Sequence, residues 1–407
     1  MTDPIPVEEL QARIAAAVGP LPARRIALAQ ARGLVLAEDI VAEVALPPFA
    51  NSAMDGYAAR VADLVGASVE RPVRLPVVGE IGAGNAGVRV LHAGQVAKIM
   101  TGAPVPEGCD TVVPYEWTDH GSEIVSITEA STPGQHVRAA GEDVRVGDHM
   151  LSIGTLLGPR QLGLIAALGR ATVAAHPRPR VVVISTGSEL CEPGTPLAPD
   201  SIYDANSHLI AASAEALGAT ARRVGIVPDD PAGFLAALHA ELAEADLVVT
   251  SGGVSQGDFD VVKEALIANG AMWFGPVAMQ PGKPQGFGLI EGVPIFTLPG
   301  NPVSSYISFE VFVAPAVRRM QGAVEVHRQT RPATLTRAVS SPAERRQFLR
   351  GDYVADASGA RVSPVGGHGS HLLGSLARSN ALIVIPEGVT SVAQGATVQV
   401  LALDLEY

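Results

Sequence analysis

The chain is poor in cysteine, in aromatic residues and in positive charge. Its two cysteines, Cys109 and Cys191, form no metal-ligand spacing, and their scarcity favours a reduced cytoplasmic protein over a disulfide scaffold. Aromatic residues make up 4% of the chain, which argues against a surface that stacks nucleic-acid bases. The 29 basic residues are outnumbered by 41 acidic ones, and this net charge of −12 argues against nucleic acid as a partner.

Long apolar runs and targeting signals are also lacking. No run approaches the roughly 18 apolar residues that a membrane-spanning helix needs. The first ten residues, MTDPIPVEEL, contain neither the basic stretch nor the apolar core of a secretory signal. We therefore expect a cytoplasmic protein with no membrane partner.

Glycine, proline and apolar side chains are abundant. Hydrophobic residues make up 47% of the 407, enough for several cores, and the length suggests two to four domains at roughly 100–200 residues each. The 43 glycines and 31 prolines together make up about 18% of the chain, above the ordinary combined share of about 12%. They follow no period, so they predict many tight turns and glycine-lined loops.

The spacing of apolar residues, and of the glycines and prolines between them, changes along the chain. Helical spacing of apolar residues predicts helices over 7–18 and over 22–33, the second ending at Gly33. Short apolar runs broken by glycine and proline predict a compact β module from 46 to 140. Strand and helix patterns alternate over 179–325, which indicates βαβ units and a doubly wound parallel sheet. Strand patterns return from 326 to the end.

Three polar loops with glycine follow the apolar strands of the alternating region. They are STGSEL at 185–190, SGGVSQGDFD at 251–260 and PGNPVSS at 299–305. Open α/β sheets bind ligands beyond the carboxyl ends of their strands, so these loops together favour an anion-binding cradle. Singly, each reads as an ordinary strand-to-helix turn, and neither the dinucleotide fingerprint nor the phosphate-loop motif is present.

Several charged residues beside these loops have both a functional and a structural interpretation. Asp258 and Asp260 suit a hard divalent cation such as Mg²⁺, but Asp258 could equally cap the next helix. Glu189 could hydrogen-bond a base or ribose, or only favour a helix dipole. Lys283, framed by two prolines in QPGKPQGFG, suits an oxyanion, or is a solvated loop lysine. Asn206 or Ser207 is a candidate helix cap.

The motifs occur together in one order. PPFANSAMDGYA, IMTGAPVPEGCDTVVP, GEDV, STGSEL, YDANS, TSGGVSQGDFD, QPGKP and LPGNPVSS follow one another along the chain. This order resembles the molybdopterin molybdenumtransferases, namely the bacterial MoeA proteins, the E domain of gephyrin and its plant counterparts. The resemblance runs from about residue 5 to the last strand.

The resemblance implies a multidomain α/β plus β fold in four parts. These are a segmented domain I (1–46 and 141–178), an inserted β domain II (47–140), an α/β molybdopterin-binding domain III with the doubly wound parallel sheet (179–325), and a C-terminal β-barrel domain IV (326–407). It also implies an elongated homodimer. The active cleft then lies between domain III of one subunit and domains I and II of the other.

The implied reaction inserts molybdate into adenylylated molybdopterin and releases AMP and molybdenum cofactor, with Mg²⁺ as the metal. Transient contact is implied with the molybdopterin adenylyltransferase, which supplies the substrate, and with acceptor molybdoenzymes. Two alternatives share parts of the pattern: the adenylyltransferase itself and a non-catalytic scaffold of the same family. The three further domains argue against the first, and the presence of the site acids argues against the second.

Site residues follow from the resemblance position by position. The implied catalytic residues are Asp55, Thr101, Asp143, Asp229 (or its neighbour Asp230) and Asp260. The implied substrate-binding residues are Glu189, Ser251, Gly252, Gly253, Lys283, Pro299, Gly300, Pro302, Arg350 and Ser370. Glu189 and Asp260 are the implied metal ligands. One departure is Gln280, where some relatives carry a lysine, so one cation is absent beside the anion site.

Overall fold

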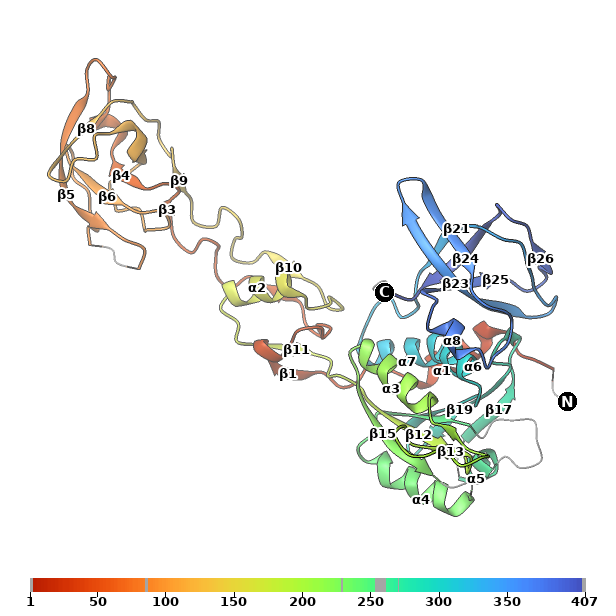
Figure 1. The fold of residues 1–407 in the computed structure, drawn as a ribbon. Coiled ribbons are helices and arrows are strands. Elements are labelled where there is room, and N and C mark those ends of the chain that lie inside the picture. The colour runs from red at the N-terminus through yellow and green to blue at the C-terminus, as the bar shows by residue number, and fades with distance from the viewer. Residues whose placement is uncertain (1–2, 85–86, 228–229, 253–260, 270, 405–407) are drawn as a thin grey trace.

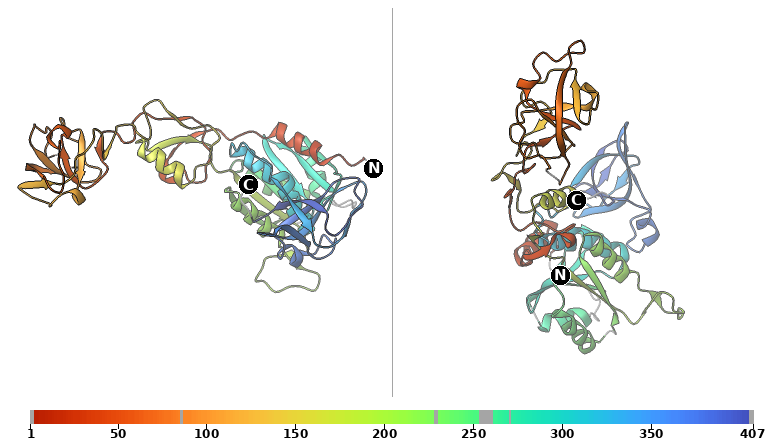
Figure 2. Two further views of the ribbon diagram at one scale, coloured as in Figure 1. Left: turned by 90° about the horizontal axis from the view of Figure 1, so that it is seen from above. Right: turned by 90° about the vertical axis from the view of Figure 1, so that its left-hand side faces the viewer.

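The structure is a computed structural model that describes residues 3–84, 87–227, 230–252, 261–269 and 271–404. The molecule is elongated: an outer β unit stands apart, a small middle unit follows, and an α/β unit with a β-barrel forms the bulk (Figures 1 and 2). Among the described helices, none is both long and apolar enough to cross a membrane.

The α/β unit is built on a six-stranded sheet with the order β15-β12-β16-β20-β19-β17. The first four strands run parallel, whereas β19 and β17 form an antiparallel edge. Their bounds are β12 Arg180–Thr186, β15 Thr220–Val227, β16 Leu247–Ser251, β17 Ala271–Pro276, β19 Pro284–Ile290 and β20 Val293–Leu298. A small pair, β13 (Leu190–Cys191) with β14 (Ile202–Tyr203), leaves the sheet after β12.

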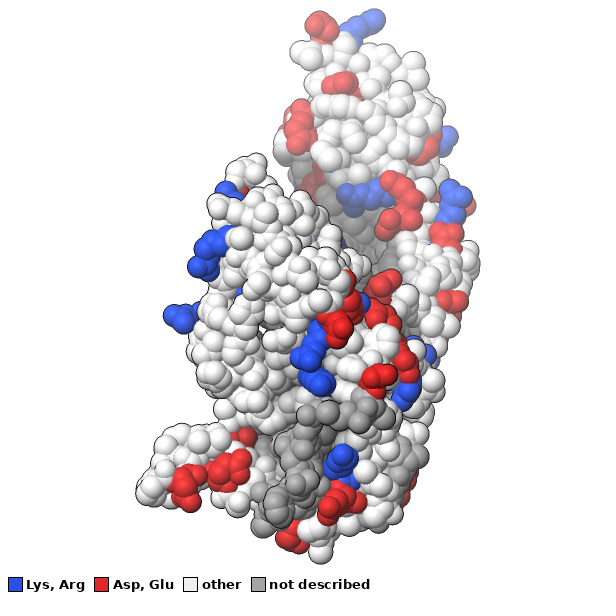
Figure 3. Space-filling view, turned by 90° about the vertical axis from the view of Figure 1, so that its right-hand side faces the viewer, with Lys and Arg blue, Asp and Glu red and all other residues white. Residues whose placement is uncertain are grey.

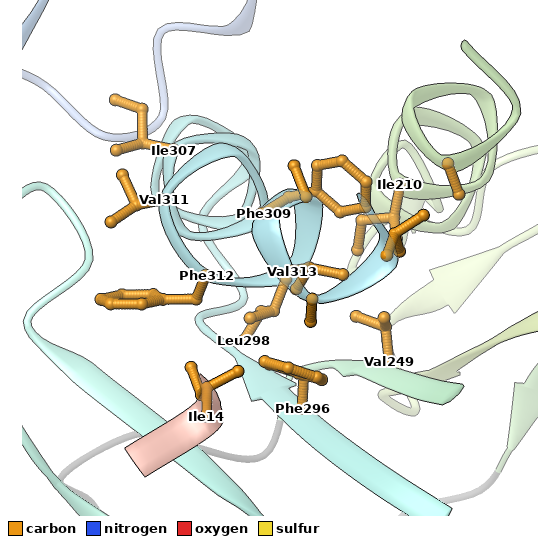
Figure 4. Close-up of a cluster of buried hydrophobic side chains, with 14 of the residues drawn as sticks. Ile14, Ile210, Val249, Phe296, Leu298, Ile307, Phe309, Val311, Phe312 and Val313 are labelled. Atoms are coloured by element: carbon orange, nitrogen blue, oxygen red, sulfur yellow. The ribbon is translucent and has the colours of Figure 1, made fainter. Parts of the chain in front are cut away.

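Helices cover both faces of this sheet, which explains why its central strands are apolar throughout. In β12, Val181 and Val183 belong to the core on one face, and Val182 and Ile184 to the core on the other. The first core is closed by helices α1, α3, α6 and α7, and the second by α4 and α5 (Figure 4 shows the first). Their bounds are α1 Val7–Ala17, α3 Asn206–Ala216, α4 Pro231–Leu242, α5 Val261–Asn269, α6 Pro302–Ser308 and α7 Ala314–Met320. This arrangement confirms the doubly wound α/β domain.

Two features of these helices were not evident from the sequence. The closing helix expected after residue 302 is interrupted by a π-helical segment, Phe309–Val313, between α6 and α7. Helix α1 packs into the α/β core through Val7, Leu10 and Ile14, although the division implied by the resemblance assigns this segment to domain I. The domain boundaries themselves stay a prediction.

The middle unit contains two antiparallel strand pairs and one helix. Strand β1 (Arg24–Ala27) pairs with β11 (Thr172–Ala175), and β2 (Ile40–Val41) pairs with β10 (His149–Leu151), beside α2 (Pro159–Ala167). The helix predicted over 22–33 is therefore wrong, because β1 and a 3₁₀ turn occupy this segment. Hydrogen bonding to a strand far along the chain overrides the local apolar spacing.

The outer unit is a five-stranded sheet with the order β7-β4-β6-β5-β8. A short pair, β3 with β9, joins it to the chain that enters and leaves. The bounds are β3 Asn51–Ser52, β4 Gly56–Ala59, β5 Val73–Ile81, β6 Val96–Ile99, β7 Thr111–Pro114, β8 Ile124–Ile127 and β9 Val137–Arg138. Both ends of this unit reach the middle unit, as expected for an insertion.

The last unit is a closed β-barrel, which confirms the expected C-terminal architecture. Its strands follow the order β23-β24-β21-β27-β25, and β25 pairs back to β23. The bounds are β21 Thr330–Leu335, β22 Val339–Ser340, β23 Arg346–Asp356, β24 Gly359–Pro364, α8 Leu373–Leu376, β25 Ala381–Ile385, β26 Ser391–Val392 and β27 Thr397–Ala402. Strand β18 (Met279–Gln280) of the preceding unit adds to β23 and ties the barrel to the α/β unit.

Candidate active site

A cavity of about 150 Å³ lies where β12, β16 and β20 end. Chain order reverses beside β12, since β15 lies on one side of it and β16 on the other, and such switch points form ligand sites in α/β sheets. Ser185 of β12 pairs with Ser251 of β16, which pairs with Leu298 of β20, so the three loops start at one level. The lining residues are Ser185, Thr186, Glu189, Leu190, 202–206, Ser251, Gly252, Gly300 and Pro302.

Glycine at position 252 allows the loop after β16 to pack against the end of β12. Gly252 has a φ of +95°, and a Cβ there would come within 2.9 Å of the Thr186 carbonyl oxygen. Its N–H donates to the Leu298 carbonyl at 3.2 Å. A Cβ at Gly300 would lie 3.8 Å from the Gly252 Cα. Bare backbone therefore lines this part of the cavity, as a site for phosphate oxygens requires.

Glu189 supplies a carboxylate at the cavity. It is exposed on the loop after β12, and a Cβ at Gly187 would lie 2.7 Å from Glu189 Oε2, so the carboxylate lies over bare backbone. Asp260, the other expected metal ligand, lies outside the described residues, as do Gly253 and Asp229. Within the described part, no three His, Cys, Asp or Glu side chains gather around a point. Asp230, the alternative to Asp229, caps helix α4 by accepting the Gly233 N–H at 2.7 Å.

Polar side chains hold the start of α3 beside the same loops. Neither Asn206 nor Ser207 caps this helix: the N-cap position is Ala205, and the Ser207 N–H donates to Asp204 Oδ1 at 3.0 Å. The cap prediction is wrong because the acceptor is the carboxylate of Asp204, two residues before the helix begins. Asn206 instead turns its amide toward the strand ends, donating to Ser251 Oγ at 2.8 Å and to the Gly300 carbonyl at 2.6 Å.

Lys283 lies on a loop that leads from the barrel contact back into the α/β sheet. Gln280 pairs with Gln347 of β23, and the chain then turns through the QPGKP loop into β19. The turn is packed tightly, because a Cβ at Gly282 would lie 2.8 Å from Ser308 Oγ of α6. Lys283 is half-buried, and none of the described carboxylates forms an ion pair with it.

Arg350 is a buried cation in the barrel without a carboxylate partner among the described residues. It is 5% exposed, and its guanidinium donates to the carbonyls of Gly367 and Gly369, while its Nε has no partner. Burial lowers the pKa of this guanidinium below its ordinary value. Arg350 also lines a cavity of about 240 Å³ with Arg337 and His368. A buried cation held only by carbonyls favours an anion.

Gly367 and Gly369, whose carbonyls bind Arg350, lead into a loop that reaches the edge of the first cavity. The Ser370 carbonyl accepts the N–H of Val303 at 3.1 Å, and Val303 follows Pro302 in the first turn of α6. Gly369, the residue before it, binds Arg350. Pro299 is buried at the end of β20. The Gly369–Ser370 segment thus links the barrel cation, by hydrogen bonds, to the first turn of α6 at the edge of the strand-end cavity.

Asp55 and Thr101 meet in the outer unit, far along the molecule from the cavity. The Thr101 N–H donates to Asp55 Oδ1 at 2.7 Å, and its hydroxyl donates to the same oxygen at 2.8 Å. These two bonds, the backbone one first, lower the pKa of the exposed Asp55 carboxyl. Asp143 is exposed near the join of the outer and middle units, where its N–H donates to the Leu46 carbonyl.

The structure thus brings the expected site residues into two clusters. The cavity cluster holds Glu189, Ser251, Gly252, Gly300 and Pro302, with Pro299 next to Gly300 and Ser370 bonded to the first turn of α6. Lys283 and Arg350 lie outside the lining of this cavity. The outer cluster holds Asp55 and Thr101, and Figure 1 shows the outer unit well separated from the α/β unit of the same chain. Their catalytic and binding roles stay predictions. Sequence reasoning considered Asn206 only as a helix cap, although its place in YDANS, beside a strand-end loop, was the available signal.

Charges of both signs are interspersed on the face of the molecule that Figure 3 shows, where Lys and Arg side chains lie among Asp and Glu side chains. Attraction for an anion on this face therefore comes from individual residues and backbone amides.

Comparison with known proteins supports one family over the whole chain. Models of the MoeA N-terminal region (domain I and II), of a probable molybdopterin binding domain and of the MoeA C-terminal region (domain IV) match residues 5–169, 182–319 and 332–403. Molybdopterin molybdenumtransferase 2 of Mycobacterium tuberculosis is 47% identical over 381 residues, which cover 92% of this chain and 94% of that protein. The Haemophilus influenzae molybdopterin molybdenumtransferase is 37% identical, with 92% of each chain covered.

Solved structures agree. Two structures of the MoeA molybdopterin biosynthesis protein of Pyrococcus horikoshii match with TM-scores of 0.85 and 0.79 and identities of 31% and 29%. The matches cover 99% and 98% of this chain and all of theirs. Fold, full-length relatives and family models agree, and the chain belongs to the MoeA family of molybdopterin molybdenumtransferases, transferases of molybdenum cofactor biosynthesis.

Proposed function

We propose that this enzyme inserts molybdate into adenylylated molybdopterin and releases AMP and molybdenum cofactor. The observation that carries this proposal is the strand-end cavity, which is lined by glycine backbone. The same chain also holds two cations, Lys283 and Arg350, that lack carboxylate partners among the described residues. The substrate carries a pyrophosphate bridge, and the incoming molybdate is a second oxyanion. A protein of net charge −12 therefore needs such local attraction.

The cavity is the proposed pyrophosphate and AMP site. The sequence assigned the backbone amides of Gly252, Gly253 and Gly300 to phosphate oxygens. Because the Gly252 N–H is bonded to the Leu298 carbonyl, Gly253 and Gly300 are the proposed amide donors, and Gly252 lines the cavity, with Ser251, Pro299 and Pro302 shaping the loops. Gly252 and Gly300 are the glycines whose backbones pack together in the structure. Preorganised backbone dipoles bind developing negative charge without rearranging during the reaction.

Lys283 and Arg350 are proposed to attract molybdate or the terminal pterin phosphate, and Ser370, next to Gly369 that binds Arg350, is a further proposed binding residue. Lys283 presents a compact charge from a stiff loop. Arg350 is fixed by two carbonyls and desolvated, which strengthens its interaction with an oxyanion. With Gln280 in place of a second lysine, Lys283 is the cation of this loop.

Mg²⁺ fits the acidic residues that we assign to it. Glu189 lines the cavity, and Asp260 is the second proposed ligand. One or two carboxylates, completed by phosphate oxygens and waters, is the coordination that Mg²⁺ favours. When bound, Mg²⁺ would offset the repulsion between these carboxylates and the pyrophosphate.

A second copy of the chain would complete the site. Asp55 and Thr101 belong to the outer unit, which Figure 2 shows well apart from the α/β unit that holds the cavity, so a homodimer would bring them to the partner's cavity. Asp143 or Asp229 would orient the attacking water and accept its proton as AMP leaves. We also expect transient contacts with the adenylyltransferase and acceptor molybdoenzymes, in the cytoplasm.

Turnover with the purified protein tests this proposal. With adenylylated molybdopterin, molybdate and Mg²⁺, we expect AMP and active cofactor in equal amounts. Lys283→Ala should raise the molybdate concentration for half-maximal rate about tenfold, the loss of one charged contact. Arg331→Ala, which removes an exposed charge of the barrel, is the control. Consumption of ATP with free molybdopterin would instead indicate the adenylyltransferase, and no turnover would indicate a scaffold.

A further inference from the structure

The Asn206 side chain bridges the two glycine loops of the cavity. Its Nδ2 donates to Ser251 Oγ at the end of β16 and to the Gly300 carbonyl after β20. A carbonyl oxygen can only accept a hydrogen bond, so the contact with Gly300 fixes which end of the amide points there. One side chain from α3 therefore holds two loops that belong to different strands.

Asn206 is itself held in a rigid frame. Asp204 is 1% exposed and accepts both the N–H of Ser207 at 3.0 Å and its hydroxyl at 2.6 Å. Arg223 of β15 donates to Ser207 Oγ at 2.7 Å and lies 3.7 Å from Asp204 Oδ2. The first turn of α3 is thus anchored to strand β15 of the sheet.

These bonds also orient groups that can meet an anion. Because Ser251 Oγ accepts from Asn206, its own proton is free to donate in another direction. The Gly300 carbonyl points toward Asn206 and is occupied by its amide. In a trans peptide the N–H points opposite to the carbonyl, so the Asn301 N–H, which shares this peptide, points away from Asn206. Both effects favour negative charge at the loops.

We propose that Asn206 is a positioning residue for this reaction: it fixes the loops after β16 and β20 at one spacing, so that their polar groups bind the phosphate of AMP together. This role rests on the proposed function. It needs no contact between Asn206 and the ligand, and it explains why an asparagine stands here. Aspartate has no proton to donate to a carbonyl, and alanine reaches neither loop.

Calorimetric titration with AMP and with adenosine separates this role from general loosening of the fold. The variants are Asn206→Ala and Asn206→Asp, the second of nearly unchanged volume. We expect AMP to bind about tenfold more weakly to Asn206→Ala, as for two lost hydrogen bonds, and at least as weakly to Asn206→Asp. Adenosine, which lacks the phosphate, should bind within about twofold of the wild-type value in both.

Asn301→Ala is the matched control, because this asparagine is in the same loop as Gly300, is exposed, and caps no N–H of α6. Its AMP affinity should stay within about twofold of wild type. Equal weakening of AMP and adenosine, or unchanged AMP affinity in both Asn206 variants, overturns the proposal. Absence of AMP release by the wild type counts against the proposed function. Normal release with unchanged AMP affinity in the variants counts against Asn206 alone.

Discussion

Single polar residues of the two clusters are fixed by neighbours that lie far from them in the chain. Asp55 receives two hydrogen bonds from Thr101, 46 positions later, and both favour the charged carboxylate. The motifs indicated each residue separately. Their bond depends on the turn before β4 meeting the turn after β6, a tertiary arrangement that local pattern does not contain.

The hydroxyl of Thr101 should keep the Asp55 carboxyl acidic. Thr101→Val removes the side-chain donor but keeps the backbone N–H, so the pKa of Asp55 should rise part of the way toward its ordinary value. The acidic limb of the pH–rate profile should then move to higher pH. A carbon-detected NMR titration of Asp55 measures the pKa directly. Thr101→Ser keeps the donor and should leave it unchanged; an unchanged pKa in Thr101→Val contradicts this account.

At the scale of elements, the apolar strands of the α/β sheet were the best predicted part. Strand β12 is buried on both faces, and its unbroken apolar run reports that directly. Segment 22–33 failed because an apolar run of helical spacing can also form a strand when a partner is available, here β11. The cap of α3 failed for a related reason: Asp204, Asn206 and Ser207 all suit a cap, and only the fold decides which one accepts.

Glycine at position 56 should be essential to the outer sheet. It opens β4, between β7 and β6, and a Cβ there would overlap the Val113 carbonyl oxygen and lie 2.9 Å from Pro114 Cα. Backbone atoms cannot rotate away, so Gly56→Ala should destabilise the outer unit by about 3 kcal/mol. Urea unfolding followed by Trp117 fluorescence measures this change. Gly82→Ala, with open space around its Cβ, should stay near wild type, and equal stability of the two variants contradicts the steric argument.

At the scale of the whole molecule, the chain separates residues that the proposed reaction needs together. The outer unit, which contains Asp55, extends from the middle unit and lies well apart from the α/β unit, which contains Lys283 (Figure 1). Sequence motifs indicated both clusters but gave no distance between them, because separation depends on how rigid units follow one another. We call the outer cluster one half-site, and the cavity cluster with Lys283 the other. Because they lie in separate units of an elongated chain, we favour a two-fold dimer, in which the outer half-site of each chain meets the cavity half-site of its partner.

Mixing a variant of each half-site should therefore restore activity. We expect Asp55→Asn to inactivate the outer half-site and Lys283→Ala to weaken the half-site of the α/β unit, so that both variants are poorly active at limiting molybdate. In a mixed dimer one cleft would carry both changes and the other neither. Unfolding and reassembly of equal amounts should yield mixed dimers as half of the population and about a quarter of wild-type activity at limiting molybdate. Each variant reassembled alone is the control. Activity no higher than the mean of these two controls would mean that each cleft is built within one chain, in which case the outer unit must swing toward its own cavity.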